Sequence, residues 1–191
     1  SDLLTTLPET RERNQQELLV QMTLGTALRG IKGANAPEVE PRYLRARALC
    51  EQVGEPPQLF QILWGLWMIY NQRGDAQTMR TTGEQLLSLA QRLEDPDLLL
   101  EAHHALWTTM FSSGELLAAR THQEQGLRLY DPQRHRPHIW LYAGHDAGVC
   151  GRYRAAPVLW LLGYPDQALA SSLAALALAQ QVAHPNTLTQ A

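Results

Sequence analysis

Four glycines recur at nearly constant intervals, and this spacing constrains the fold of the chain more than any other feature. Gly33, Gly74, Gly114 and Gly163 each separate two apolar runs, with 41, 40 and 49 residues from one to the next. An acidic residue follows each of the last three within three positions. Glycine at a helix end tolerates the left-handed conformation, and an acidic side chain stabilises the start of the next helix. The pattern therefore predicts a repeated pair of helices.

Prolines mark the other boundary of each pair, because proline at the first helical position costs no intrahelical hydrogen bond. Pro8, Pro56, Pro96 and Pro185 each precede a run that continues in helical fashion. The period-2 alternation of strands does not recur. The sequence thus predicts helices near residues 9–30, 37–53, 57–73, 75–93, 96–113, 115–130, 147–162 and 165–182.

The fourth unit departs from this pattern. Its glycine comes 49 residues after the third one, so residues 131–146 form an irregular insertion. The helix that follows contains Gly148, Gly151 and Pro157. Because an internal proline costs about 3 kcal/mol in a regular helix, we expect this helix to be kinked or broken. Long insertions are often functional, so this region is the first place to look for a specialised role.

The repeat also carries the residues of a known family. The second unit has an apolar and aromatic series: Leu63, Leu66, Trp67, Tyr70, Gly74, Asp75 and Leu86. The third has His103, Leu106, Trp107, Met110, Gly114, Glu115, Ala119, Gly126 and Leu127. This series resembles the tetratricopeptide repeat, although the period is near 40 residues here and about 34 in the family. The segment from Leu161 to Leu169 is similar to the helical region that follows the ATPase module in bacterial adenylate/guanylate cyclase-like signalling proteins.

The resemblance implies an all-α, right-handed α-solenoid of about four tetratricopeptide-like hairpins, with repeats near 9–53, 56–94, 96–131 and 145–183. It also implies a single array, residues 1–191, that is a fragment of a larger cytoplasmic protein with cyclase and ATPase domains. The array itself is expected to be a non-catalytic regulatory module that binds a protein or peptide partner, or a small-molecule effector. A structural or self-association scaffold is the alternative, and a helical enzyme ranks last.

Composition narrows the classes of partner. A net charge of −3 and a pI near 6.1 provide no excess of positive charge for nucleic acid or an anionic membrane surface. No run of about 18 apolar residues predicts a membrane span. Cys50 and Cys150 lie far apart and suit reduced thiols in the cytoplasm. We therefore expect no nucleic acid, no membrane and no cofactor.

The family lines its concave groove with one face of the first helix of each pair. Carried over by register, the candidate groove residues are Gln61, Trp64, Met68, Asn71, Gln72, Glu101, His104, Thr108, Phe111, Ser112, Tyr153 and Trp160. Aromatic side chains with a few polar groups suit a peptide or an apolar ligand. An equally open interpretation is that Trp64 and Trp160 only pack between repeats.

Several short patterns invite a chemical interpretation, and each has a simpler one. Glu101 and His104 form Glu-x-x-His, half of a di-metal pattern that needs a second copy, and a groove-lining or solvated histidine is the alternative. Cys150 and His145 could form a nucleophile and base, or Cys150 could be a small core thiol. The basic cluster 134–138 could bind an anion or form a solvated loop. The sequence therefore predicts no catalytic residue and no metal site.

Overall fold

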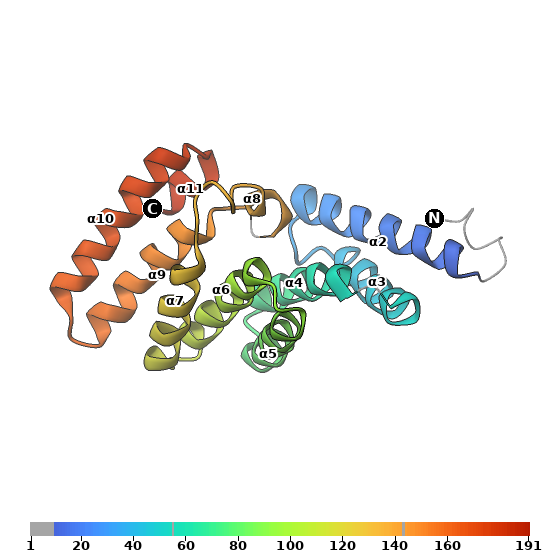
Figure 1. The fold of residues 1–191 in the computed structure, drawn as a ribbon, viewed down its shortest axis with the longest axis horizontal. Helices are drawn as coiled ribbons and strands as arrows, with labels where there is room; N and C mark the ends of the chain where they lie inside the picture. The colour runs from blue at the N-terminus through green and yellow to red at the C-terminus, as the bar shows by residue number, and fades with distance from the viewer. Residues whose placement is uncertain (1–9, 55, 143) are drawn as a thin grey trace. The chain divides into compact units, whose positions relative to one another are not determined.

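The structure, a computed structural model, describes residues 10–54, 56–142 and 144–191, and every regular element in these ranges is an α-helix (Figure 1). No strand occurs among these residues, so the predicted all-α class is confirmed. The helices are α2 (Arg11–Lys32), α3 (Val39–Val53), α4 (Pro56–Arg73), α5 (Ala76–Leu93), α6 (Pro96–Ser112), α7 (Leu116–Leu129), α8 (His138–Leu141), α9 (Ala147–Leu161), α10 (Pro165–Val182) and α11 (Pro185–Gln190). No helix in the described ranges is long and apolar enough to cross a membrane.

The four repeated glycines all end helices in the way the sequence predicts. Gly33, Gly74, Gly114 and Gly163 have φ of 87°, 70°, 76° and 87°, a region that a residue with a Cβ rarely adopts. They follow α2, α4, α6 and α9. Each is thus a helix stop that lets the chain reverse into the next helix.

Capping side chains and prolines define the helix starts. The Asp95 carboxylate accepts hydrogen bonds from two backbone N–H groups in the first turn of α6, and Pro96 is the first residue of that helix. Pro165 and Pro185 start α10 and α11 in the same position. The marker at Pro8 and the predicted helix start at residue 9 lie outside the described residues.

The chain divides into two compact units, Ser1–Thr82 and Gly83–Ala191, and the boundary falls within α5. In the N-terminal unit, α2, α3 and α4 pack around Tyr43. Two glycines allow this packing: a Cβ on Gly65 would lie 2.3 Å from the Tyr43 ring, and one on Gly25 would lie 3.2 Å from it. The core around the ring includes Leu18, Val39, Leu49, Ile62 and Leu66.

The C-terminal unit is built from two helical hairpins, α6 with α7 and α9 with α10. Helix α9 also packs against α6 and α7, and α11 packs on α9 and α10. Trp107 is fully buried at the centre of one core cluster, with Leu100, Ala147 and Cys150. Consecutive helices therefore pack as adjacent pairs, and α9 of the second pair contacts α6 of the first.

Of the two expectations for α9, a kink or a break, the break does not occur. Helix α9 is continuous over Ala147–Leu161 with Pro157 inside it. Its glycines serve close packing: a Cβ on Gly148 would lie 2.3 Å from the Tyr130 ring, and one on Gly151 would lie 2.9 Å from Leu127. Both glycines are needed because side chains of neighbouring segments occupy the space that a Cβ would fill, and this packing is not visible in the sequence.

Candidate functional site

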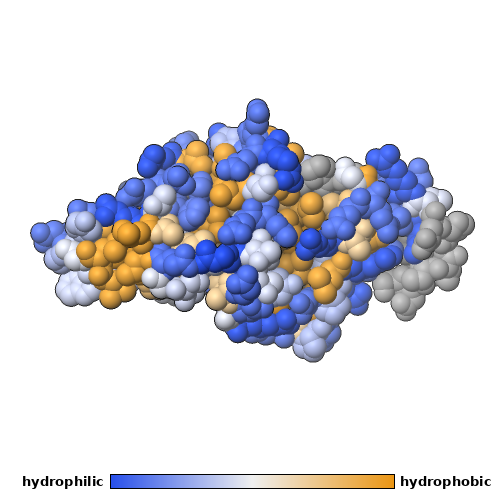
Figure 2. Space-filling view, turned by 90° about the horizontal axis from the view of Figure 1, so that it is seen from below, coloured by the Kyte–Doolittle hydropathy of each residue, from blue (hydrophilic) through white to orange (hydrophobic). Residues whose placement is uncertain are grey.

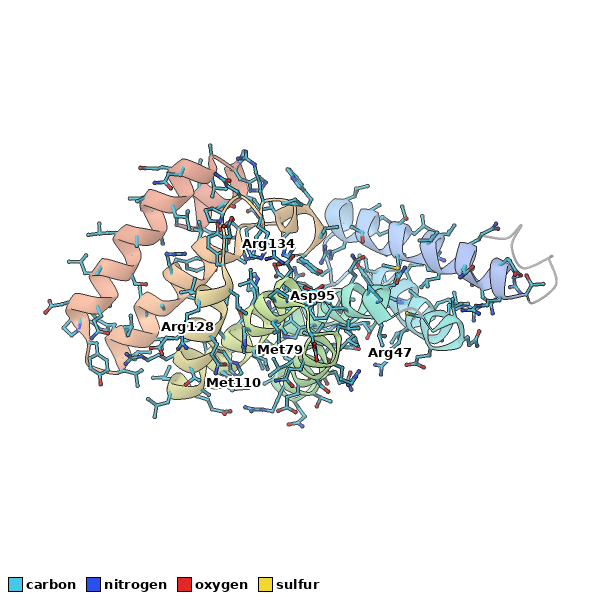
Figure 3. All side chains as sticks on the ribbon, viewed as in Figure 1. Arg47, Met79, Asp95, Met110, Arg128 and Arg134 are labelled. Carbon is cyan, nitrogen blue, oxygen red and sulfur yellow. The ribbon has the colours of Figure 1, made fainter. Side chains whose placement is uncertain are left out.

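The insertion 131–146 is attached to α6 by charged side chains, and it contains the short helix α8. Arg134, which is labelled in Figure 3, lies in this insertion. Its Nε lies 2.7 Å from Asp97 Oδ1, and His135 Nε2 lies 3.0 Å from the same oxygen. The ring of His135 is 2 % exposed, and its Nδ1 accepts a hydrogen bond from the backbone N–H of Asp131. Asp97 thus ties the insertion to the first turn of α6.

This arrangement differs from both interpretations of the basic cluster. Arg134 and His135 face Asp97, and His138 Nδ1 lies 2.8 Å from Glu101 Oε1. Arg136 is exposed. The cluster is therefore neither a simple solvated loop nor a free anion site, because three of its side chains pair with carboxylates of α6.

The end of the insertion is fixed by Asp146, which is 1 % exposed. Its Oδ1 caps α9 by accepting the backbone N–H of Val149, and its Oδ2 accepts the hydroxyl of Tyr130 at 2.9 Å. Its own backbone N–H donates to Thr187 Oγ1 in α11. These bonds set the position of the preceding residue, His145, and the direction of α9.

Glu101 lies at the centre of the polar cluster inside the C-terminal unit. It is 1 % exposed, and each of its oxygens binds a different histidine. Oε2 lies 3.1 Å from His104 Nδ1 on the same helix, and Oε1 lies 2.8 Å from His138 Nδ1 on α8. A buried carboxylate is stable only when it is paired in this way.

The far side of His104 faces the start of α9. His104 Nε2 lies 3.3 Å from His145 Nε2, and the His104 ring stacks on Trp107 at 4.7 Å. The sulfur of Cys150 lies in the same group: its Sγ and one nitrogen of each histidine are all within 4.8 Å of one another. Cys150 and His104 are each 2 % exposed, whereas His145 is half-buried.

We name Glu101, His104, His138, His145 and Cys150 the Cys/His cluster. Burial opposes ionisation of the thiol, but His104 and His145 outweigh it and hold the pKa of Cys150 well below its usual range. Burial likewise opposes the charge on His104, yet Cys150 and Glu101 raise its pKa above the usual value. The metal-free cluster therefore favours a thiolate beside an imidazolium.

A thiolate beside two imidazoles supports two kinds of chemistry. It can act as a nucleophile with a histidine base and Glu101 as the group that orients the base. It can also ligate a soft or borderline metal ion through one sulfur and two nitrogens.

The hydroxyl of Tyr153 lies beside the sulfur. Burial, and after it the charge on Cys150, raises the pKa of Tyr153 to about 12. Tyr153 therefore remains a neutral hydrogen-bond donor at ordinary pH.

The candidate groove residues fall into both units and differ widely in exposure. In the N-terminal unit Trp64 is 1 % exposed, Gln72 is exposed, and Gln61, Met68 and Asn71 are half-buried. In the C-terminal unit Glu101, His104 and Thr108 are buried, Phe111 and Tyr153 are half-buried, and Ser112 and Trp160 are exposed. Only Glu101, His104 and Tyr153 belong to or border the Cys/His cluster. A role of the whole set in partner binding stays a prediction.

The two pairs that form most of the cluster are visible in the sequence, but nothing in the sequence shows that they meet. Glu101 with His104, and His145 with Cys150, were each treated as an isolated pair, and His138 was assigned to a loop. One sequence signal could have joined them. Each pair lies near the start of the first helix of a predicted hairpin, and in a stack of hairpins these first helices are neighbours. Joining the pairs still required the actual packing of α9 on α6.

No family model matches the chain. The chain is 27 % identical over 188 residues to an uncharacterized protein of Rhizobium meliloti (strain 1021), and the match covers 97 % of this chain. The chain spans only 18 % of the length of that relative. The match therefore does not show that this chain shares an activity or a partner of the whole relative.

Proposed function

We propose that this chain is a non-catalytic regulatory module, a right-handed solenoid of tetratricopeptide type that binds an effector or a partner within a larger cytoplasmic signalling protein. The paired helices and the four glycine stops support the repeat architecture. The similarity to one stretch of a much longer protein supports its place in a multidomain chain. The link to a cyclase and an ATPase rests on the sequence resemblance.

The observation that carries the non-catalytic role is the burial of the reactive groups. Cys150 and His104 are each 2 % exposed, and Glu101 is 1 % exposed. A nucleophile must reach the reacting atom of its substrate, so an organic substrate could react here only if α6 and α9 separated. A site enclosed between two hairpins is better suited to a small effector that changes the stability of the unit.

The rate of thiol alkylation tests this role, and the chain supplies its own control. Cys50 in the N-terminal unit is also 2 % exposed and serves as the reference thiol. In the native protein we expect iodoacetamide to modify Cys150 as slowly as Cys50, and both rapidly in urea. Fast, stoichiometric modification of Cys150 in the native chain, with a hydrolytic activity lost in Cys150→Ala, would overturn the proposal.

A second candidate function is self-association, and the exposed apolar surface where α9 ends and α10 begins favours it (Figure 2). Trp160, Leu161 and Leu169 are 66 %, 63 % and 62 % exposed. Trp160 and Leu169 border a shallow apolar groove of about 290 Å³. Light scattering over a range of concentrations tests this candidate: Leu169→Glu should abolish any dimer, and a concentration-independent monomer rules it out.

A further inference from the structure

We infer that His104, His145 and Cys150 form a binding site for a Zn²⁺-class cation. Their three ligand atoms come from α6, from the end of the insertion and from α9, and they all lie within 4.8 Å of one another. The inference deepens the proposed function by naming the effector, and only its regulatory consequence rests on that function.

The separation of the ligand atoms fits tetrahedral zinc. Zinc binds imidazole nitrogen at about 2.0–2.1 Å and thiolate sulfur at about 2.3 Å, which places ligand atoms roughly 3.3–3.7 Å apart. His104 Nε2 and His145 Nε2 already lie 3.3 Å apart. The sulfur of Cys150 lies within 4.8 Å of both nitrogens, so it needs to approach them by no more than about 1.5 Å.

The carboxylate of Glu101 prepares His104 as a ligand. Because Nδ1–H is donated to Glu101 Oε2 at 3.1 Å, loss of the Nε2 proton leaves His104 with its lone pair on Nε2, which faces His145. Histidine ligands of metals usually donate their second N–H to a carboxylate in this way, and the contact fixes both the tautomer and the ring orientation. Stacking of the ring on Trp107 holds its plane as well.

The donor set selects the class of ion. One sulfur and two nitrogens suit zinc and related transition metals, whereas calcium and magnesium require oxygen ligands. The two oxygens of Glu101 are engaged by His104 and His138. Binding displaces the Nε2 proton of His104, which leaves to solvent, while the thiolate of Cys150 coordinates through its own lone pair.

A second pair of close histidines, His103 and His122, is not part of any group of three potential metal ligands in the part of the chain that the structure describes. His103 Nδ1 lies 3.0 Å from His122 Nδ1. Among the described residues, a search for three or more histidine, cysteine, aspartate or glutamate ligands finds only the group of His104, His145 and Cys150. His122→Ala is therefore a matched control that removes a close histidine pair without touching the proposed site.

The half-buried side chain of His145 gives the ion a path from solvent. Three protein ligands leave one tetrahedral position for water or a small anion, with the Tyr153 hydroxyl close to the sulfur. Because the ligands come from two hairpins and the insertion, a bound ion would hold α6, α9 and the insertion together. Zinc would thus act as the effector that sets the stability of the C-terminal unit.

Metal titration of the whole chain tests the inference. The protein is stripped with a chelator and titrated with Zn²⁺ against a chromophoric competitor, and its metal content is measured by elemental analysis. We expect one Zn²⁺ per chain with a dissociation constant below about 1 µM. With Co²⁺ in place of zinc, a thiolate-to-cobalt charge-transfer band should appear and should vanish in Cys150→Ser.

Variants separate a specific site from adventitious binding. Cys150→Ser and His145→Ala should each weaken binding by at least about 100-fold, and Glu101→Gln by about 10- to 100-fold. Cys50→Ser and His122→Ala should bind as the wild type does. His145 is half-buried, so His145→Ala should keep the wild-type circular dichroism and remain informative if Cys150→Ser fails to fold.

The inference fails if the stripped protein binds no metal, or if folded His145→Ala binds zinc as tightly as the wild type does. Either result would leave the proposed regulatory module standing, because alkylation of Cys150 tests that role independently. Rapid alkylation with turnover would remove the regulatory module whatever the zinc result.

Discussion

Among the residues that the structure describes, each unit of this protein buries one glutamate, and the two glutamates have different partners. In the N-terminal unit Glu17 is 6 % exposed and is bound by Arg45 through two contacts of 2.7 and 2.9 Å and by Arg13 at 3.4 Å. In the C-terminal unit Glu101 is 1 % exposed and is bound by His104 and His138. Both carboxylates are satisfied, but only one has partners that can change their protonation state.

The two glutamates differ in whether their partners can change charge: the partners of Glu17 stay charged, whereas the partners of Glu101 can lose or gain a proton. Arginine stays charged at all ordinary pH, so the contact between Glu17 and Arg45 has one state. Histidine can be neutral, protonated or bound to a metal, so the contact between Glu101 and His104 can be reset by a proton or an ion. The Cys/His cluster therefore has the chemistry of a switch, and the N-terminal cluster has the chemistry of a structural contact.

Removing each glutamate should produce the largest contrast. In metal-free protein, Glu101→Ala leaves the buried His104 and the half-buried His138 without their carboxylate and should lower the free energy of unfolding by about 3–5 kcal/mol. Glu17→Ala should cost less, about 2 kcal/mol, because the side chain of Arg45 is 43 % exposed and remains hydrated, and only the buried Arg13 loses a contact, at 3.4 Å. Urea denaturation measures both values, and equal losses would contradict the distinction.

Zinc should stabilise one unit and not the other. At a free concentration about 100 times its dissociation constant, a bound ligand adds about 2.7 kcal/mol to folded-state stability. Hydrogen exchange should therefore slow in α6 and α9 when zinc is added, and it should stay unchanged in α2 and α3. Equal protection of both regions would mean that zinc acts elsewhere on the chain.

A pair of glycines tests whether packing alone controls the site. A Cβ on Gly148 or on Gly65 would lie 2.3 Å from a tyrosine ring, so each alanine variant should lose about 1–3 kcal/mol of stability. Only Gly148→Ala should also weaken zinc binding, because α9 carries Cys150. Gly30→Ala is the control: no atom lies within 4 Å of its Cβ position, and it should stabilise α2 by about 0.5–1 kcal/mol. Denaturation and zinc titration of the three variants give the comparison.

The smallest expected effect is the pH dependence of the N-terminal contact. The hydrogen bonds from Arg45 outweigh burial and lower the pKa of Glu17 below its ordinary value of 4.5. A lowered folded-state pKa contributes stability above pH 4.5, and that contribution is lost as the pH falls below it. Thermal unfolding between pH 6 and pH 3 should therefore show a smaller acid-induced loss in Glu17→Gln than in the wild type. An identical loss in both proteins would remove this contact as a source of acid sensitivity.

Much of the secondary structure was predictable because its signals are local. The glycine stops and the prolines at helix starts mark boundaries within one or two turns of the residues that cause them, and the predicted 165–182 matches α10 (Pro165–Val182). Helix α8 was missed, since its four residues are too few to show a period. The break expected in α9 was wrong, because Gly148 and Gly151 make room for Tyr130 and Leu127, at and just beyond the end of α7, and do not interrupt their own helix.

The site was predictable only in pieces. Glu101 and His104 are visible as a pair because residues three apart lie on the same face of a helix. The approach of His104 to His145 spans 41 residues of sequence. It depends on the Asp146 cap and on the insertion being held against α6 by Asp97. None of these contacts has a sequence period, so pattern analysis could not supply them.

The sequence by itself determined an all-helical chain, the turns at its repeated glycines and an irregular segment at 131–146. The tertiary structure decided that this segment, α6 and α9 enclose one buried group of a glutamate, histidines and a cysteine. Helix formation follows from short-range hydrogen bonds and side-chain spacing, whereas the meeting of Cys150 with His104 follows from how glycine-lined helices pack. The feature that suggests zinc binding therefore belongs to the packing and not to any motif.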